Sequence, residues 1–132
     1  MNEMKWPALM AAAKAASARA YCPYSQFAVG AAVQTADRHV FSGCNVENAS
    51  YGLAICAERN AIFHAVAEGA RDIVAVAVYT PTPAFATPCG ACRQVLLELA
   101  RNAEVLCACD GPTHARFTVA SLLPNAFALP PA

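Results

Sequence analysis

The feature that most restricts how this chain can fold is a pair of predicted helices that each begin at a cysteine. The apolar spacing predicts helices over about residues 56–68 and 89–100, so that Cys56 opens one helix and Cys89 opens the other. A helix N-terminus presents unpaired N–H groups and the positive end of the helix dipole, and both favour a thiolate over a thiol. Cys92 follows three residues after Cys89, which places both sulfurs on one side of the first turn. We therefore expect a fold that brings two helix starts together around a metal ion.

Three thiolates indicate one catalytic zinc ion per chain. Structural zinc sites are almost always closed by four protein ligands, whereas catalytic sites keep one position open for water. Glu58 lies two residues after Cys56, in the same predicted first turn, where its carboxylate can reach a water on the metal. We expect Glu58 to act as the general acid and base of a hydrolytic reaction.

Three thiolates on Zn²⁺ leave a net charge of minus one, which weakens the ability of the metal to acidify water. A positive group nearby would offset this charge, and Arg59 and Arg93 each adjoin one part of the cysteine motif. The sequence does not decide which of the two acts in this way. A solvated surface arginine is the alternative for each of them.

The remaining cysteines have no comparable setting. Seven cysteines form an odd number, which argues against a disulfide framework and for a reducing compartment. Cys107 and Cys109 alternate with apolar residues in a predicted strand, where buried thiols are common. No role is assigned to Cys22 or Cys44. If Cys44 approached the metal, the fourth position would be closed and the site would be structural.

The pattern of helices and strands predicts a single α/β domain over residues 1–132. A further helix is expected over about residues 7–20, and strands over residues 27–35, 39–43, 73–80, 105–109 and 117–120. The run at 73–80 is continuously apolar, as in a strand that is buried on both faces. Strands that alternate with helices after an opening hairpin predict a three-layer α/β/α domain with a mixed sheet of about five strands.

Composition favours a small substrate and self-association. Apolar residues make up 58% of the chain and charged residues 14%, which leaves few charges to cover the surface of a small domain. Nine basic and nine acidic side chains cancel, and no basic stripe is present to bind a polynucleotide. Lys14 interrupts the apolar run at residues 6–13, which favours an amphipathic helix over a secretory signal. We expect a cytoplasmic protein that does not bind membranes.

The two cysteine stretches match the three-cysteine form of the zinc-deaminase pattern. Over nearly its whole length the chain resembles the small homotetrameric cytidine deaminases. The resemblance rests on five stretches: Pro23-Tyr24-Ser25-x-Phe27-x-Val29-Gly30-Ala31, Gly43-Cys44-Asn45-Val46-Glu47-Asn48, Cys56-Ala57-Glu58-Arg59, Pro88-Cys89-Gly90-x-Cys92-Arg93-Gln94 and Leu122-Leu123-Pro124.

This resemblance implies a role in substrate binding for several residues. Phe27 would stack on the pyrimidine, Asn45 and Glu47 would bind the ribose hydroxyls, and the backbone at Ala57 would read the base. Tyr51 and Phe127 would complete sites that are shared between the subunits of a homotetramer. Without the resemblance, Phe27 is interpreted as a core residue and Asn45 and Glu47 as part of a polar turn.

The resemblance also implies the reaction, which is hydrolytic deamination of cytidine and deoxycytidine in pyrimidine salvage. The nearest alternative is a relative that acts on another cytosine nucleoside, such as a nucleoside antibiotic. A polynucleotide-editing deaminase conflicts with the balanced charge. A non-catalytic binding module stabilised by zinc would require a fourth protein ligand.

Overall fold

A computed structural model of the chain describes residues 6–131 and contains five strands and four α-helices in that range. The elements follow one another as α1 (Trp6–Ser17), β1 (Gly30–Thr35), β2 (Val40–Cys44), the 3₁₀ helix η2 (Tyr51–Leu53), α2 (Ala57–Ala67), β3 (Ile73–Thr80), α3 (Gly90–Leu99), β4 (Glu104–Cys109), β5 (Ala115–Thr118) and α4 (Val119–Leu122).

The strands form one mixed sheet in the order β2-β1-β3-β4-β5. Only β3 and β4 are parallel neighbours, and α3 lies in the crossover that joins them. Strand β1 is antiparallel to both β2 and β3, so β2 and β3 run in the same direction. The chain therefore leaves β2 and β3 at the same end of the sheet, and α2 and α3 begin near each other at that end.

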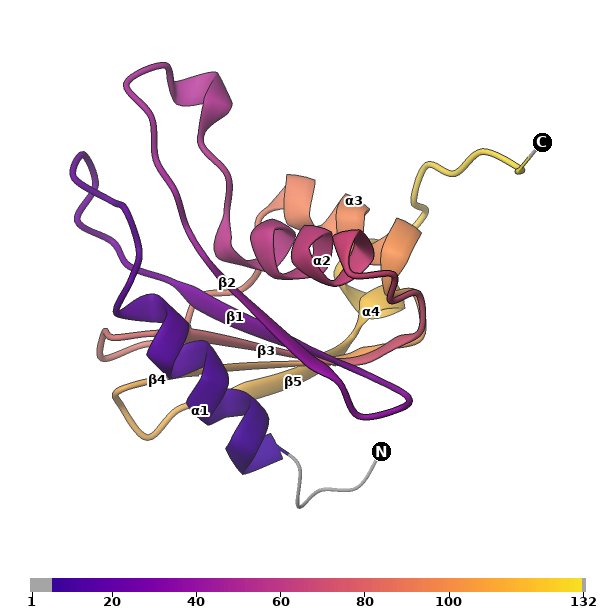
Figure 1. Ribbon diagram of the computed structural model, residues 1–132, viewed down its shortest axis with the longest axis horizontal. Helices are drawn as coiled ribbons and strands as arrows, with labels where there is room; N and C mark the ends of the chain where they lie inside the picture. Colours follow the sequence, from indigo (N-terminus) through magenta and orange to yellow (C-terminus); the bar gives the residue numbers. More distant parts are fainter. Residues whose placement is uncertain (1–5, 132) are drawn as a thin grey trace.

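Helices cover both faces of the sheet, and the predicted three-layer arrangement is confirmed (Figure 1). Helix α1 packs on one face, where its buried Leu9 and Ala13 meet Ala32, Ala77 and Tyr79. Helices α2, α3 and α4 lie on the opposite face over the larger apolar core. Because both faces are covered, β3 is buried along almost its whole length, as its apolar run predicts.

Two glycines allow the helices to lie close to the sheet. A Cβ atom built on Gly43 of β2 would lie 2.4 Å from the backbone nitrogen of Ala61 in α2. A Cβ atom on Gly30 of β1 would lie 1.8 Å from the carbonyl oxygen of Ala13 in α1. No side chain larger than hydrogen fits at either position without displacing backbone, so these contacts fix the distance between the helices and the sheet.

The predicted elements differ from the structure mainly at their ends. The predicted strand over residues 27–35 was wrong at residues 27–29, because the backbone there binds Asn45, mainly through its side-chain amide, and forms no ladder with a neighbouring strand. The predicted strand over 117–120 was wrong at its end, because the Thr118 hydroxyl accepts a hydrogen bond from the Ser121 backbone N–H and starts α4.

Candidate active site

The three predicted metal ligands meet at the starts of α2 and α3. Cys56 and Cys89 are the N-cap residues of the two helices, as the sequence predicts, and Cys92 lies in the first turn of α3. The Sγ atom of Cys89 lies 3.7 Å from that of Cys56 and 3.5 Å from that of Cys92. All three sulfurs lie within 4.8 Å of one another, and no other cluster of three potential ligands is found in residues 6–131.

This spacing fits zinc. Tetrahedral coordination with Zn–S bonds of about 2.3 Å places neighbouring sulfurs about 3.8 Å apart. The two measured separations, 3.7 and 3.5 Å, are close to that value. The three thiols are therefore already arranged as one face of a tetrahedral site, and within residues 6–131 no fourth side chain of a ligating type belongs to the group.

Arg59 is the positive group beside these sulfurs. Its Nη2 atom donates a hydrogen bond to the Sγ atom of Cys56 over 3.3 Å. Hydrogen bonds from Cys92 and then from Arg59 lower the pKa of Cys56 to about 5, against the opposing effect of burial. The pKa of Cys92 is raised, because Cys92 donates to Cys56 and lies buried. Of these two thiols, Cys56 therefore ionises more readily.

Arg93 binds the protein backbone. Its Nε atom donates to the carbonyl oxygen of Pro88 over 2.7 Å, and its Nη1 atom donates to that of Leu122 over 2.9 Å. A third bond runs from Nη2 to the Thr87 hydroxyl over 3.2 Å. Arg93 thus connects the loop before α3 with the end of α4.

Glu58 lies in the first turn of α2, and only 5% of its surface is exposed. Burial raises the pKa of this carboxyl group to about 7, and the negative charge of Cys56 acts in the same direction. A carboxyl group with a pKa near neutrality can both accept and return a proton. This is the property required of a general acid and base beside a metal ion.

A pocket of about 270 Å³ opens next to the cysteines, and its walls contain most of the residues predicted to bind substrate. It is lined by Ser25, Phe27, Val29, Asn45, Glu47, Cys56, Ala57, Glu58, Val78, Ala86, Thr87 and Cys89. The aromatic ring and the polar sugar-binding candidates therefore share one cavity with Glu58 and two of the three sulfurs.

The residues that line this pocket come from the α1–β1, β2–α2 and β3–α3 connections, from the start of α2 and from β3. Figure 1 shows the first two of these connections extending from the same end of the sheet. Val46 pairs with Tyr21, which joins the α1–β1 and β2–α2 connections by backbone hydrogen bonds, and it also pairs with Ile55 within the β2–α2 connection. The side-chain oxygen of Asn45 accepts from the Val29 backbone N–H over 2.9 Å, and its Nδ2 atom donates to the Phe27 carbonyl oxygen over 2.8 Å. Asn45 thus supports the segment that carries the aromatic ring.

Tyr51 and Phe127 lie outside this pocket. Tyr51 begins η2 and is 80% exposed, and it lines a neighbouring hollow of about 260 Å³. Phe127 is 69% exposed on the C-terminal segment, where its carbonyl oxygen accepts a hydrogen bond from Gln94 of α3. Among the residues that the structure describes, both of these aromatic residues are therefore largely exposed.

None of the other four cysteines or the three histidines belongs to the group formed by the three sulfurs. All seven cysteines are free thiols, and Cys107 is buried in β4 as its alternating pattern predicts. Cys44 donates a long hydrogen bond to the carbonyl oxygen of Arg19 and does not belong to the metal-binding group. His64 lies on the exposed face of α2 and contacts the carbonyl oxygen of Ser42.

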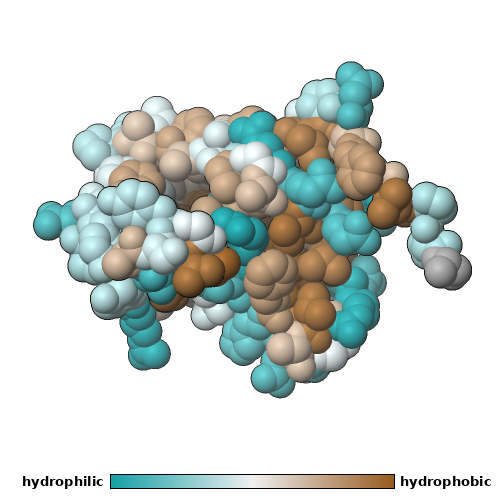
Figure 2. Space-filling view, turned by 90° about the horizontal axis from the view of Figure 1, so that it is seen from above, coloured by the Kyte–Doolittle hydropathy of each residue, from teal (hydrophilic) through white to brown (hydrophobic). Residues whose placement is uncertain are grey.

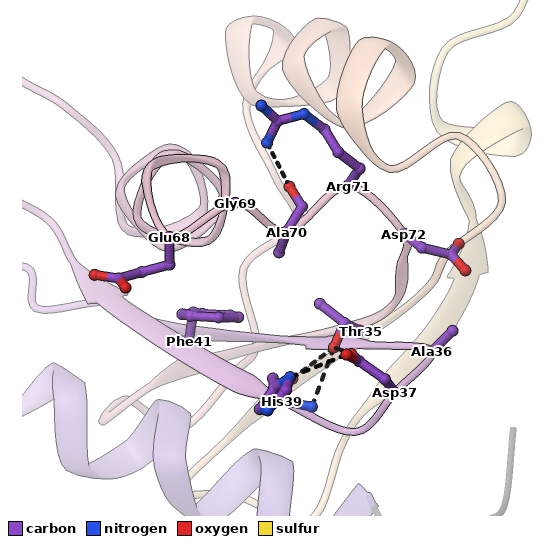
Figure 3. A pocket seen from close by; sticks show the side chains of 10 residues that line it. All are labelled: Thr35, Ala36, Asp37, His39, Phe41, Glu68, Gly69, Ala70, Arg71 and Asp72. Carbon is purple, nitrogen blue, oxygen red and sulfur yellow. Dashed lines mark hydrogen bonds and ion pairs between the residues drawn. The ribbon is translucent and has the colours of Figure 1, made fainter.

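A separate hollow of about 410 Å³ lies between the β1–β2 turn and the end of α2 (Figure 3). Several of the polar groups that line it bind one another or nearby backbone carbonyl groups. Asp37 accepts from the Thr35 hydroxyl and pairs with His39, while Arg71 donates to the carbonyl oxygens of Ala70 and Val66. This hollow contains no cysteine, and its side chains do not form a metal-binding group.

Comparison with known proteins decides the family. The family model described as the cytidine and deoxycytidylate deaminase zinc-binding region matches residues 4–109, which include all three cysteines and Glu58. The chain belongs to the cytidine and deoxycytidylate deaminase family.

Individual relatives agree with this assignment. A cytidine deaminase of Halalkalibacterium halodurans is 52% identical over 110 residues, which cover 82% of this chain and 83% of the relative. The crystal structure of cytidine deaminase from Burkholderia pseudomallei superposes with a TM-score of 0.89 at 49% identity, over 96% of this chain and all of that one. The structure from Mycobacterium tuberculosis gives a TM-score of 0.80 at 42% identity, over 94% and 98% of the two chains.

Ser25 is a pocket residue of this deaminase for which the sequence predicts no individual role. It lies in the Pro23-Tyr24-Ser25 stretch, and its hydroxyl donates a hydrogen bond to Glu47. Sequence offers only a weak signal for such a contact, because Ser25 and Glu47 are far apart in the chain. The nearby pocket residues Val78 and Thr87 carried no signal either, since each belongs to an ordinary strand or loop pattern.

Proposed function

We propose that this chain is a zinc-dependent hydrolase that deaminates cytidine and deoxycytidine, giving uridine or deoxyuridine and ammonia in pyrimidine salvage. The observation that carries the proposal is the pocket in which buried Glu58 lies beside Cys56 and Cys89, with Phe27 in the same lining. Residues 1–132 are proposed to act as one catalytic domain.

Cys56, Cys89 and Cys92 would hold the zinc ion, and Arg59 would balance part of the charge on the sulfurs. When bound, zinc supplies Lewis-acid activation of water at neutral pH. Glu58 takes one proton from the attacking water and delivers it to N3 of the cytosine ring, while the water oxygen forms a bond to C4. The same carboxylate then takes the second proton from the new C4 hydroxyl and gives it to the amine as the C4–N bond breaks, so ammonia leaves and a C4 carbonyl remains.

The remaining pocket residues bind and orient the nucleoside. The ring of Phe27 offers an apolar face to the pyrimidine, and the backbone of Ala57, at the start of α2, lies where it can read the polar edge of the base. Asn45 and Glu47 provide an amide and a carboxylate for the sugar hydroxyls. Each of these groups lines the cavity that contains Glu58.

We further propose that the chain assembles as a homotetramer in which Tyr51 and Phe127 contribute to sites of neighbouring subunits. Both rings are largely exposed, although burying such rings is favourable. Apolar side chains also interrupt the polar surface on the face that carries α2 and α3 (Figure 2). Self-association would cover these apolar groups.

The proposed location is the cytoplasm, and the proposed partners are the nucleoside and further copies of this chain. Seven free thiols suit a reducing compartment. Over residues 6–131, the longest helices fall short of the length and apolarity that a bilayer crossing requires. The balanced net charge supports a small nucleoside over a polynucleotide.

Replacing Glu58 by Gln tests the proposed chemistry. The amide has nearly the shape of the carboxyl group but cannot take up a proton, so we expect turnover of cytidine to fall by about 10²–10⁴-fold. Zinc content, measured by elemental analysis of the same sample, should remain at the parent level because Glu58 is not among the three ligands. Parent-level turnover in the Glu58→Gln variant would contradict the assigned role.

A further inference from the structure

Ser25 joins two segments of the pocket wall, the α1–β1 connection that carries Phe27 and the β2–α2 connection that carries Glu47. Its hydroxyl donates a hydrogen bond to Oε2 of Glu47 over 2.5 Å and accepts one from the Phe27 backbone N–H over 3.0 Å. Its own backbone N–H donates to Oε1 of Glu47 over 3.1 Å. One small side chain thus joins the proposed sugar-binding carboxylate directly to the segment that carries the proposed base-stacking ring.

The Ser25–Glu47 pair also forms a partition. Both residues line the pocket of about 270 Å³ beside the cysteines, and both line the hollow of about 260 Å³ that contains Tyr51. Displacing either side chain would therefore change the wall of the substrate pocket as well as the position of the carboxylate.

The backbone around Ser25 needs this support. Gln26, the residue between Ser25 and Phe27, has a φ angle of 57°, in the left-handed region that non-glycine residues rarely adopt. The Gln26 N–H donates to the carbonyl oxygen of Cys22 over 2.9 Å, and the Asn45 side chain donates to the carbonyl oxygen of Phe27. The bond from the Phe27 N–H to the Ser25 hydroxyl closes this tight turn on its other side.

Counting acceptor positions shows what Glu47 has left for a sugar. A carboxylate offers about four lone-pair positions for hydrogen bonds. The backbone N–H groups of Tyr24 and Ser25 and the hydroxyl of Ser25 occupy three of them. These bonds, with that of the Ser25 hydroxyl foremost, also lower the pKa of Glu47 and keep it ionised. About one position remains, and the direction in which it points is fixed by the three bonds already made.

We propose that Ser25 is a positioning residue that aims the remaining acceptor of Glu47 at a sugar hydroxyl while holding the backbone that presents Phe27 to the base. This inference rests on the proposed function, because it assumes that a cytosine nucleoside occupies the pocket. Ser25 does not touch the reacting atoms in this role. It acts on substrate binding through Glu47 and Phe27, so its loss should raise KM and leave kcat nearly unchanged.

Three variants of the zinc-loaded protein test the inference. Ser25→Ala removes the hydroxyl, Ser25→Thr keeps it, and Ser42→Ala is the matched control, because Ser42 is an exposed serine on β2 outside the pocket. We expect Ser25→Ala to raise KM for cytidine about tenfold, which is the effect of losing the hydrogen bond between a sugar hydroxyl and the charged Glu47. The change in kcat should be less than about twofold. Ser25→Thr and Ser42→Ala should remain within about twofold of the parent in both constants.

A second ligand, used as a competitive inhibitor, separates the positioning of Glu47 from a general effect on the loop. The inhibition constant of 2′,3′-dideoxycytidine against cytidine is measured for the parent and for Ser25→Ala. Because this ligand lacks the hydroxyls that Glu47 would bind, we expect its inhibition constant to rise by less than about threefold. The inference would be overturned if Ser25→Ala raised the inhibition constant as much as KM, left KM for cytidine unchanged, or lowered kcat instead of raising KM. A zinc-loaded parent that does not deaminate cytidine would instead refute the proposed function.

Discussion

Replacing Arg59 by Gln should weaken zinc binding, and the size of the effect follows from the position of its guanidinium group. Nη2 lies 3.3 Å from Sγ of Cys56. Two unit charges at that distance attract each other by about 5 kcal/mol at an effective dielectric constant of about 20, and by about 1.3 kcal/mol in bulk water. Substituting a residue that binds a metal ligand typically costs about 10–100-fold in affinity, or about 1.4–2.7 kcal/mol, which lies within these limits.

We therefore expect the zinc dissociation constant of Arg59→Gln to rise about 10–100-fold. Glutamine keeps much of the side-chain length and removes the charge that stabilises the Cys56 thiolate. The dissociation constant is measured by competition with a chelating dye of known zinc affinity, at fixed pH and with a thiol reductant present. Circular dichroism of the zinc-free protein would show whether the variant keeps its fold.

Arg93→Gln is the matched comparison. The hydrogen bonds of Arg93 go to the backbone of Pro88 and Leu122 and to the Thr87 hydroxyl. We expect this variant to lower the midpoint of thermal unfolding and to keep the zinc dissociation constant within about threefold of the parent. If Arg93→Gln weakened zinc binding as much as Arg59→Gln, assigning charge balance to Arg59 would be incorrect.

Two further substitutions test the packing and the proposed assembly. Gly43→Ala should lower the free energy of unfolding by about 1–3 kcal/mol, because the added Cβ would meet the α2 backbone. Urea unfolding measures this loss, and Gly52→Ala is the control because its Cβ would meet no atom within 4 Å. Phe127→Ala should raise KM for cytidine by about tenfold if the ring completes a neighbouring site, yet leave unfolding by urea nearly unchanged because the ring is 69% exposed within its own chain. Parent-level KM in Phe127→Ala would contradict the shared site.

The parts of the fold that depend on short stretches of sequence were predictable. Cys56 and Cys89 were predicted to open two helices, and each is the N-cap of its helix. The run over residues 73–80 was predicted to be a buried strand, and β3 has those limits. In each case the signal lies within about a dozen neighbouring residues, so no tertiary contact was needed to interpret it.

The parts that depend on side chains from distant segments were not predictable. Residues 27–29 follow a strand-like pattern, yet the Asn45 amide takes the place of a strand neighbour there. Ser25 and Glu47 lie 22 positions apart in the sequence, and no spacing rule predicts a hydrogen bond between residues so far apart. Likewise, Arg59 and Arg93 looked equivalent in the sequence, and only their positions in space distinguish their hydrogen-bond partners.

The central claim is that three thiolates and Glu58 form one catalytic zinc site for a cytosine nucleoside. The most direct measurement is made on a single purified sample, in which zinc is quantified per chain while the loss of cytidine absorbance and the release of ammonia are followed. The account predicts one zinc ion per chain and equal amounts of cytidine consumed and ammonia released. A sample that holds one zinc ion per chain and leaves cytidine unchanged would contradict the account.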